Sequence, residues 1–68
     1  MDKKIDPASV GEYVAEILAR ERPEYNEEAV KRQQDMLAEA ARTAGLSEQD
    51  MQRALDALQR GYQERTKP

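Results

Sequence analysis

The sequence predicts a small all-α protein, a bundle of three helices. Apolar residues recur at helical spacing in three segments, proline and glycine separate these segments, and no stretch alternates as a strand does. We expect helices over 7–21, 27–44 and 48–60, with a frayed tail at 63–68 and a flexible segment at 1–5. The whole chain, 1–68, then forms one small helical domain.

The first predicted helix has a start signal, an apolar face and a stop signal. Asp6 offers a capping side chain, and Pro7 at the first helical position gives up no amide that the helix needs. Pro23 stops the helix, because the residue before a proline is disfavoured in the helical region. Between these signals the apolar side chains fall on one face, which we expect to be core, with its tyrosine either at the edge of the core or as an anchor for an interface: Val10, Tyr13, Val14, Ile17 and Leu18.

The second predicted helix carries the widest apolar arc. Asn26 can cap it, Glu27 and Glu28 suit the positive end of the helix dipole, and Gly45 ends it. An arc this wide can touch two neighbours, so we expect this helix to be central. Its members are Ala29, Val30, Gln33, Met36, Leu37, Ala40, Ala41 and Ala44.

The third predicted helix follows almost directly. Gly45 suits the left-handed position after a helix, Leu46 can fold back onto the last turn, and Ser47 with Asp50 resembles a capping box. Gly61 marks the expected end. The apolar stripe of this helix consists of Met51, Ala54, Leu55, Leu58 and Tyr62.

The composition limits both the stability and the partners of the chain. Sixty-eight residues without Phe or Trp form a thin core, worth about 3 to 8 kcal/mol by the usual per-residue scaling. The 11 basic and 14 acidic side chains leave a net charge of -3, which gives no bulk attraction to nucleic acid or anionic lipid. The sequence contains no cysteine and no apolar run long enough to span a membrane, and residues 1–9 lack the apolar centre of a signal peptide. We therefore expect a cytoplasmic protein.

The residue types argue against enzyme chemistry. The chain lacks His and Cys, which removes the commonest general base, the commonest nucleophile and the usual transition-metal ligands. No Gly-rich phosphate loop or calcium loop is present. We therefore expect no enzyme activity, no catalytic residue, no metal, no cofactor and no small-molecule substrate.

The spacing in 37–56 also fits a helix-turn-helix. A small residue lies four positions before the turn glycine, an apolar residue follows that glycine, and two more anchor the second helix. These residues let two helices cross closely, so the pattern indicates packing first and DNA binding second. The residues that match it are Ala41, Gly45, Leu46, Met51 and Ala54.

The face that would read DNA is acidic. Gln49, Gln52 and Arg53 can donate hydrogen bonds to bases. Glu48 and Asp56 lie on the same face, and carboxylates aimed at a polyanion oppose binding. A helix-turn-helix regulator is therefore the alternative function, and we expect no specific DNA binding at physiological salt.

The first helix also carries a stripe of small residues. Gly11, Ala15 and Ala19 follow one another at a spacing of four, beside Leu18. A stripe of this kind permits close approach of another helix, and a glycine inside a helix often has a packing role. The other interpretation is that the alanines are simply good helix formers on an exposed side.

Gln33 is the one polar member of the central apolar arc. A buried amide needs a partner, so Gln33 can fix the register between helices or meet a group on another protein. Alternatively, the arc is shallow at this level and Gln33 reaches water.

These patterns predict a small helical protein-binding module. We expect an accessory subunit, inhibitor, antitoxin-like factor or phage-type modulator that makes helix-to-helix contacts with another protein or with a second copy in a dimer. The run VAEILARERPE, residues 14–24, resembles a stretch in the theta subunit of bacterial replicative polymerase, a small helical protein that binds the proofreading subunit. This resemblance covers eleven residues, and no site residue is carried over from it. The predicted binding residues are Gly11, Ala15, Leu18, Ala19 and Gln33.

Overall fold

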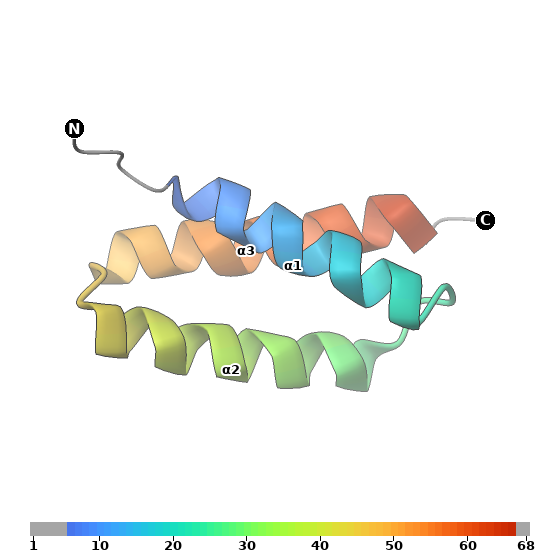
Figure 1. Ribbon diagram of the computed structural model, residues 1–68, viewed down its shortest axis with the longest axis horizontal. Coiled ribbons are helices and arrows are strands. Elements are labelled where there is room, and N and C mark those ends of the chain that lie inside the picture. The colour runs from blue at the N-terminus through green and yellow to red at the C-terminus, as the bar shows by residue number, and fades with distance from the viewer. Residues whose placement is uncertain (1–5, 67–68) are drawn as a thin grey trace.

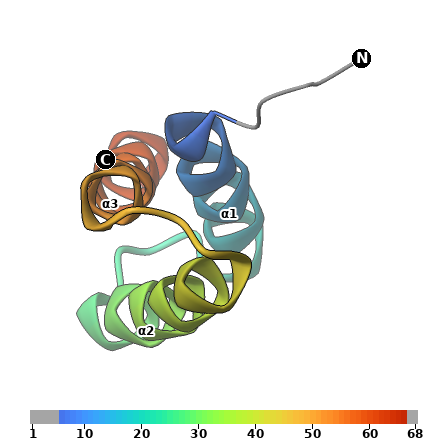
Figure 2. The same ribbon diagram turned by 90° about the vertical axis from the view of Figure 1, so that its left-hand side faces the viewer.

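The computed structural model of the chain describes residues 6–66 and contains three helices. α1 spans Pro7–Glu21, α2 spans Glu27–Ala44 and α3 spans Glu48–Thr66. α1 and α3 lie side by side and run in the same direction, and α2 runs back along them (Figure 1 and Figure 2). The predicted all-α three-helix bundle is confirmed, and the described part of the chain contains no strand.

The ends of α1 and α2 are those that the sequence predicts, because local groups define them. Asp6 and Asn26 each accept a hydrogen bond from a backbone amide of the first turn, at 3.2 and 3.0 Å. Gly45 ends α2 with φ of 80°, in the left-handed region that glycine adopts without steric cost. The next helix starts at once, with the Asp50 amide donating to Ser47 Oγ at 3.2 Å.

α3 is longer than the sequence predicts. We expected it to end near residue 60 with Gly61 as the stop signal, whereas it continues to Thr66. Gly61 lies inside the helix, where a Cβ atom would come within 3.0 Å of the Ala15 Cβ. This glycine therefore permits a close crossing with α1 and does not end α3. Residues 63–66, predicted as tail, are helical; residues 67–68 and the predicted flexible segment 1–5 lie outside the described residues.

α1 and α3 make the closest contact in the bundle. A Cβ atom on Gly11 would overlap the carbonyl oxygen of Ala54 and lie 2.9 Å from the Ala57 Cβ. Further along, Gly61 of α3 faces Ala15 of α1. Two glycines thus bring the two helices together, and α1 packs far more extensively on α3 than on α2.

The core combines three alanines with four larger side chains and lies against this contact. Only part of the apolar face predicted for α1 belongs to it: Leu18 is buried, whereas Val10 and Val14 are half-buried. Leu37 of the apolar arc predicted for α2 and Leu55 of the apolar stripe predicted for α3 are half-buried as well. The buried hydrophobic residues are Ala15, Leu18, Val30, Ala41, Ala54, Leu58 and Tyr62.

Tyr62 ties the connection between α1 and α2 to the end of α3. Its side chain is fully buried, and its ring stacks on Tyr25 with the centroids 5.2 Å apart. The hydroxyl accepts a hydrogen bond from the Asn26 amide at 3.1 Å. It lies 2.9 Å from the carbonyl oxygen of Glu24 and 3.0 Å from that of Arg22, which share its single hydrogen. The hydroxyl thereby holds residues 22–26 in place.

Candidate protein-binding surface

The small-residue stripe of α1 faces the inside of the molecule. Gly11, Ala15 and Leu18 are buried, and the first two lie directly against α3. The close helix crossing that the stripe predicts is therefore present, but the neighbour is a helix of the same chain. We correct our assignment of these three residues to a contact with another protein, because a side chain covered by α3 is not available to a partner.

The other two predicted binding residues are half-buried. Ala19 packs against the edge of the core. Gln33 lines a hollow between the end of α1 and the start of α2, where its amide stays partly exposed. The amide that connects two helices is that of Gln34, whose Nε2 donates to the Leu55 carbonyl at 3.3 Å. A role for Gln33 toward a partner stays a prediction.

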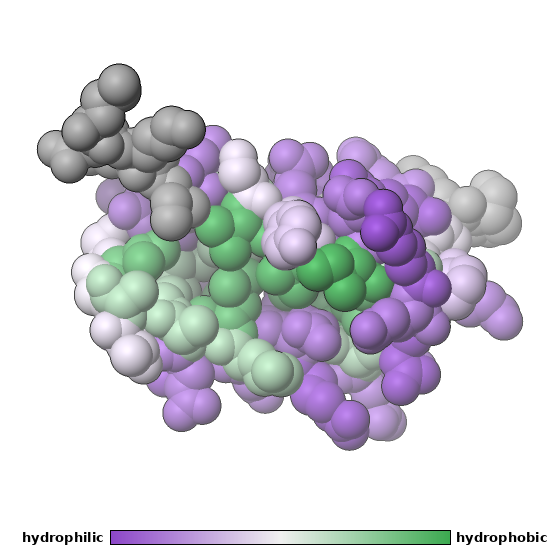
Figure 3. Space-filling model, in the orientation of Figure 1, coloured by the Kyte–Doolittle hydropathy of each residue, from purple (hydrophilic) through white to green (hydrophobic). Residues whose placement is uncertain are grey.

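A groove separates α1 from α2 on the face shown in Figure 3, where apolar side chains form a band across the middle of the molecule. α1 contributes the apolar face that we had predicted to be core. Because α1 turns its small stripe toward α3, its larger side chains Val10, Val14 and Ile17 fall toward α2. We call this feature the α1–α2 groove and define it by these three residues and by Leu37 and Ala40 of α2.

One end of the groove is an apolar hollow of about 260 Å³. Its walls include many alanines, and these short side chains leave space that larger ones would fill. Among residues 6–66, Asp50 is the only charged one in its lining. The walls come from all three helices and the second connection: Val10 of α1, Leu37, Ala40 and Ala44 of α2, Leu46, and Ala54 of α3.

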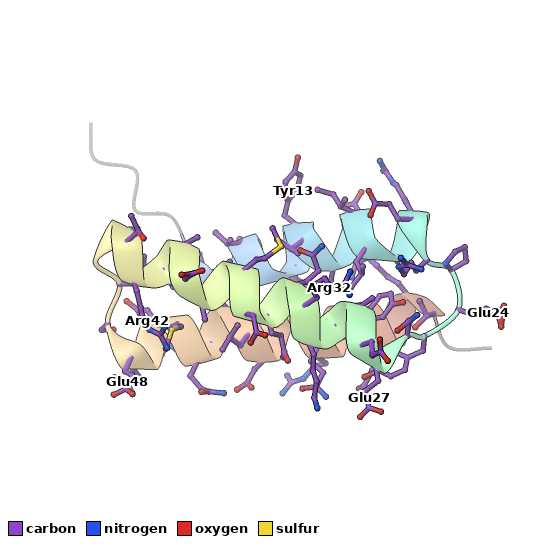
Figure 4. All side chains as sticks on the ribbon, turned by 90° about the horizontal axis from the view of Figure 1, so that it is seen from below. Tyr13, Glu24, Glu27, Arg32, Arg42 and Glu48 are labelled. Atoms are coloured by element: carbon purple, nitrogen blue, oxygen red, sulfur yellow. The ribbon has the colours of Figure 1, made fainter. Side chains whose placement is uncertain are left out.

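The other end of the groove is a polar hollow of about 340 Å³. Arg22 and Arg32 line it together with Glu21, Glu28 and Gln33. Figure 4 shows Arg32 between α2 and α1, so its guanidinium is directed across the groove. The groove therefore changes from apolar to polar along its length.

Large apolar side chains stand at the two edges of the groove. Tyr13 of α1 is 66% exposed and projects away from the bundle (Figure 4), Ile17 one turn later is 40% exposed, and Met36 of α2 is 61% exposed. Helical spacing places Tyr13 on the side of Val10 and Ile17, and Met36 on the side of Ala40. This is an exposed apolar surface with an apolar cavity beside it, the combination that marks binding sites.

The residues of the DNA-binding alternative lie on the far side of α3. Gln49, Gln52 and Arg53 are exposed, and Gln52 Nε2 donates to Asp56 Oδ1 at 3.2 Å. α2 and α3 lie alongside each other in opposite directions (Figure 1), whereas the helices of a helix-turn-helix cross at roughly 90–120°. The pattern in 37–56 thus forms a helical hairpin.

The structure adds no sign of a metal centre. Within residues 6–66, no group of three or more His, Cys, Asp or Glu side chains is arranged to hold a metal ion. None of the described helices combines the length and the apolar character that a membrane crossing requires.

Sequence reasoning found the residues of the groove but placed them in the core. A signal for the correct arrangement is present: small residues line one side of α1 at Gly11 and Ala15, and Ala54 and Gly61 line α3. Two matching small stripes predict a close crossing of those two helices, which turns the larger side chains of α1 outward.

Known proteins add nothing to this picture. No protein-family model, no curated protein and no solved structure matches the chain. The function is therefore argued from the surface alone.

Proposed function

We propose that this chain is a protein-binding module that receives the apolar face of an amphipathic helix from a protein partner in the α1–α2 groove. The observation that carries the proposal is the exposure of Tyr13, Ile17 and Met36 around an apolar hollow. The module acts by helix-to-helix contact, as expected from the sequence, but through the large apolar side chains of α1 in place of its small ones.

The energetics favour a partner at this position. Full burial of a side chain such as Ile or Met is worth about 1.5 to 3 kcal/mol. Tyr13, Ile17 and Met36 each leave much of that free energy unused in the isolated chain. A helix laid along the groove can cover all three with apolar anchors at positions i, i+3, i+4 and i+7.

The two ends of the groove define the chemistry of the partner helix. The apolar hollow accepts a bulky uncharged side chain, whereas the polar hollow presents the guanidinium groups of Arg22 and Arg32. Glu21 and Glu28 line the polar hollow as well, so its charges balance. An aliphatic or aromatic anchor at one end and a polar side chain that forms hydrogen bonds at the other complement the two hollows.

Affinity capture from an extract of the native cell tests the proposal if the unaltered chain is compared with three variants. Ile17→Glu and Met36→Glu place a charge at the groove, and Gln49→Glu places the same charge on the exposed start of α3. We expect a partner that binds the unaltered chain and Gln49→Glu but neither groove variant. Hydrogen exchange should then show protection in 10–17 and 33–40 and in a helical segment of the partner.

Two results contradict the proposal. Equal capture by all four proteins places the binding surface elsewhere. Loss of every captured protein after nuclease treatment supports the DNA-binding alternative, because nucleic acid then connects the chain to the other proteins.

A further inference from the structure

We propose that residues 1–5 close the apolar hollow in the free chain, with the side chain of Ile5 seated in it beside Val10. The hollow is the end of the α1–α2 groove to which we assign the apolar anchor of a partner helix. The inference therefore rests on the proposed function and adds its regulation. A partner has to displace a segment of the chain itself before its anchor can bind.

α1 begins at the rim of the apolar hollow. Asp6 is the N-cap of α1, and both Pro7 and Val10 line the hollow. Ile5 directly precedes the cap, and Val10 is the fourth residue of the helix. Apolar residues at these two positions pack on each other in the arrangement called a hydrophobic staple. Because Val10 belongs to the wall, an Ile5 side chain that packs on it enters the hollow.

The hollow has the space and the walls that an aliphatic side chain needs. Its volume is about 260 Å³, and an apolar cavity of about 150 Å³ already accommodates a benzene ring. Leu46 is 38% exposed in the lining, and Ala40 and Ala44 beside it are exposed. Figure 2 looks onto this end of the bundle, where α1 begins, α2 ends and α3 begins. An Ile5 side chain seated here covers apolar surface from all three helices, which favours the closed arrangement.

Charge complementarity favours the same occupant. Asp50, in the first turn of α3, is the only charged residue among 6–66 that lines the hollow. Residues 1–5 contain two lysines, Lys3 and Lys4, and one aspartate. An exposed pair of opposite charges adds little stability, because water screens it. The lysines therefore direct the segment toward α3, and the apolar side chain supplies most of the stabilisation.

The short connection makes residues 1–5 a strong competitor for the hollow. One residue, Asp6, separates Ile5 from the wall at Pro7. A group held on a short connection has an effective concentration in the millimolar range, which a separate partner at micromolar concentration does not reach. The apparent affinity for that partner falls in proportion to the fraction of chains in which the hollow is open.

Nuclear Overhauser contacts between methyl groups test the closure in the full chain. We expect cross-peaks from the Ile5 methyl groups to those of Val10, Ala44 and Leu46, which line the hollow. Leu55 lies outside that lining and should give none. Absence of all the cross-peaks to the lining residues overturns the inference.

Binding of benzene measures the opening of the hollow without a protein partner. Ile5→Ser removes the apolar group and leaves the Asp6 cap in place, and Ile17→Ser makes the same change on α1 outside the hollow. Shifts of the Ala44 and Leu46 methyl signals report the binding. We expect benzene to bind Ile5→Ser at least about threefold more tightly than the unaltered chain, and Ile17→Ser as the unaltered chain. Equal affinity for all three proteins overturns the inference.

The outcomes separate the inference from the proposed function. If the hollow is open in the free chain, capture of a partner that Ile17→Glu abolishes still leaves the proposed function standing. If residues 1–5 close the hollow and capture ignores the groove variants, the proposed function is wrong and the segment covers the end of the bundle alone. If both hold, Ile5→Ser should capture more of the partner than the unaltered chain does, and Ile17→Ser should capture less.

Discussion

The two sides of α1 differ in how they are used. Toward α3, Gly11 and Ala15 allow backbones to approach so closely that a Cβ atom on Gly11 would overlap the Ala54 carbonyl oxygen. Toward α2, Val10, Val14 and Ile17 remain half-buried or exposed. The smallest side chains of α1 therefore form its contact with α3, and its larger side chains line the groove toward α2.

Close packing explains this outcome. Helices that approach through small residues bring many backbone and side-chain atoms into van der Waals contact. Each contact stabilises the fold only slightly, but the sum of these contacts is large. α1 can present only one face to α3. Gly11 and Ala15 occupy that contact. The larger side chains of Val10, Val14 and Ile17, about a third of a turn away on the helix, then have to face α2 or solvent.

The largest expected effect comes from Ala15→Arg. Ala15 is fully buried opposite Gly61, so an arginine there overpacks the crossing and buries a charge, costing more than about 3 kcal/mol. We expect a largely unfolded chain by circular dichroism. Ala40→Arg, the same change at the groove, should shift stability by less than about 0.5 kcal/mol in the monomer. Equal melting curves for the two variants would show that the α1–α3 contact and the α1–α2 groove tolerate an arginine equally well.

The sequence predicted the helices better than their contacts. The bounds of α1 and α2 follow from Asp6, Asn26 and Gly45, whose capping hydrogen bonds and backbone conformation are local. The end of α3 was missed because Gly61 was taken as a stop signal, whereas it lies inside the helix against Ala15, a relation between residues far apart in the chain.

The binding surface was missed for a similar reason. Helical periodicity shows which residues share a face, but it does not show which face meets which neighbour. Gly11, Ala15 and Leu18 were expected to contact another protein or a second copy, whereas the close crossing at this stripe is with α3. Ile17 was expected in the core and lies at the edge of the groove, where Tyr13 is exposed as well.

Leucine truncation compares the core with the groove directly. Leu58 is fully buried, so Leu58→Ala should lower the free energy of unfolding by about 2 to 5 kcal/mol. Leu37 is half-buried beside the apolar hollow, and Leu37→Ala should cost only about 1 to 2 kcal/mol, because part of its surface already meets water. Urea unfolding of both variants measures the difference. A larger loss from Leu37→Ala would show that the groove side carries more of the stability than α1–α3 packing does.

Tyr62→Phe tests the anchor of the connection that sets the polar end of the groove. The ring can keep its stacking on Tyr25, but the hydroxyl is lost, and with it the hydrogen bond from the Asn26 amide. We expect a loss of about 1 to 2 kcal/mol in thermal or urea unfolding, with faster hydrogen exchange of the Asn26 amide. Unchanged exchange at Asn26 would show that residues 22–26 hold their conformation without Tyr62.

The smallest expected effect is that of Met36→Gln. Met36 is 61% exposed at the edge of the groove, so at low protein concentration the melting temperature should stay where it is, with a change in free energy within about 0.5 kcal/mol. At high concentration the two proteins should differ, because association stabilises the folded state and makes the melting temperature rise with concentration. We expect this rise for the unaltered chain and a smaller one for Met36→Gln, measured by calorimetry across a dilution series. Parallel curves for the two proteins at every concentration would mean that this edge of the groove contacts no second copy. The difference between the two sides of α1 would then concern folding and not association.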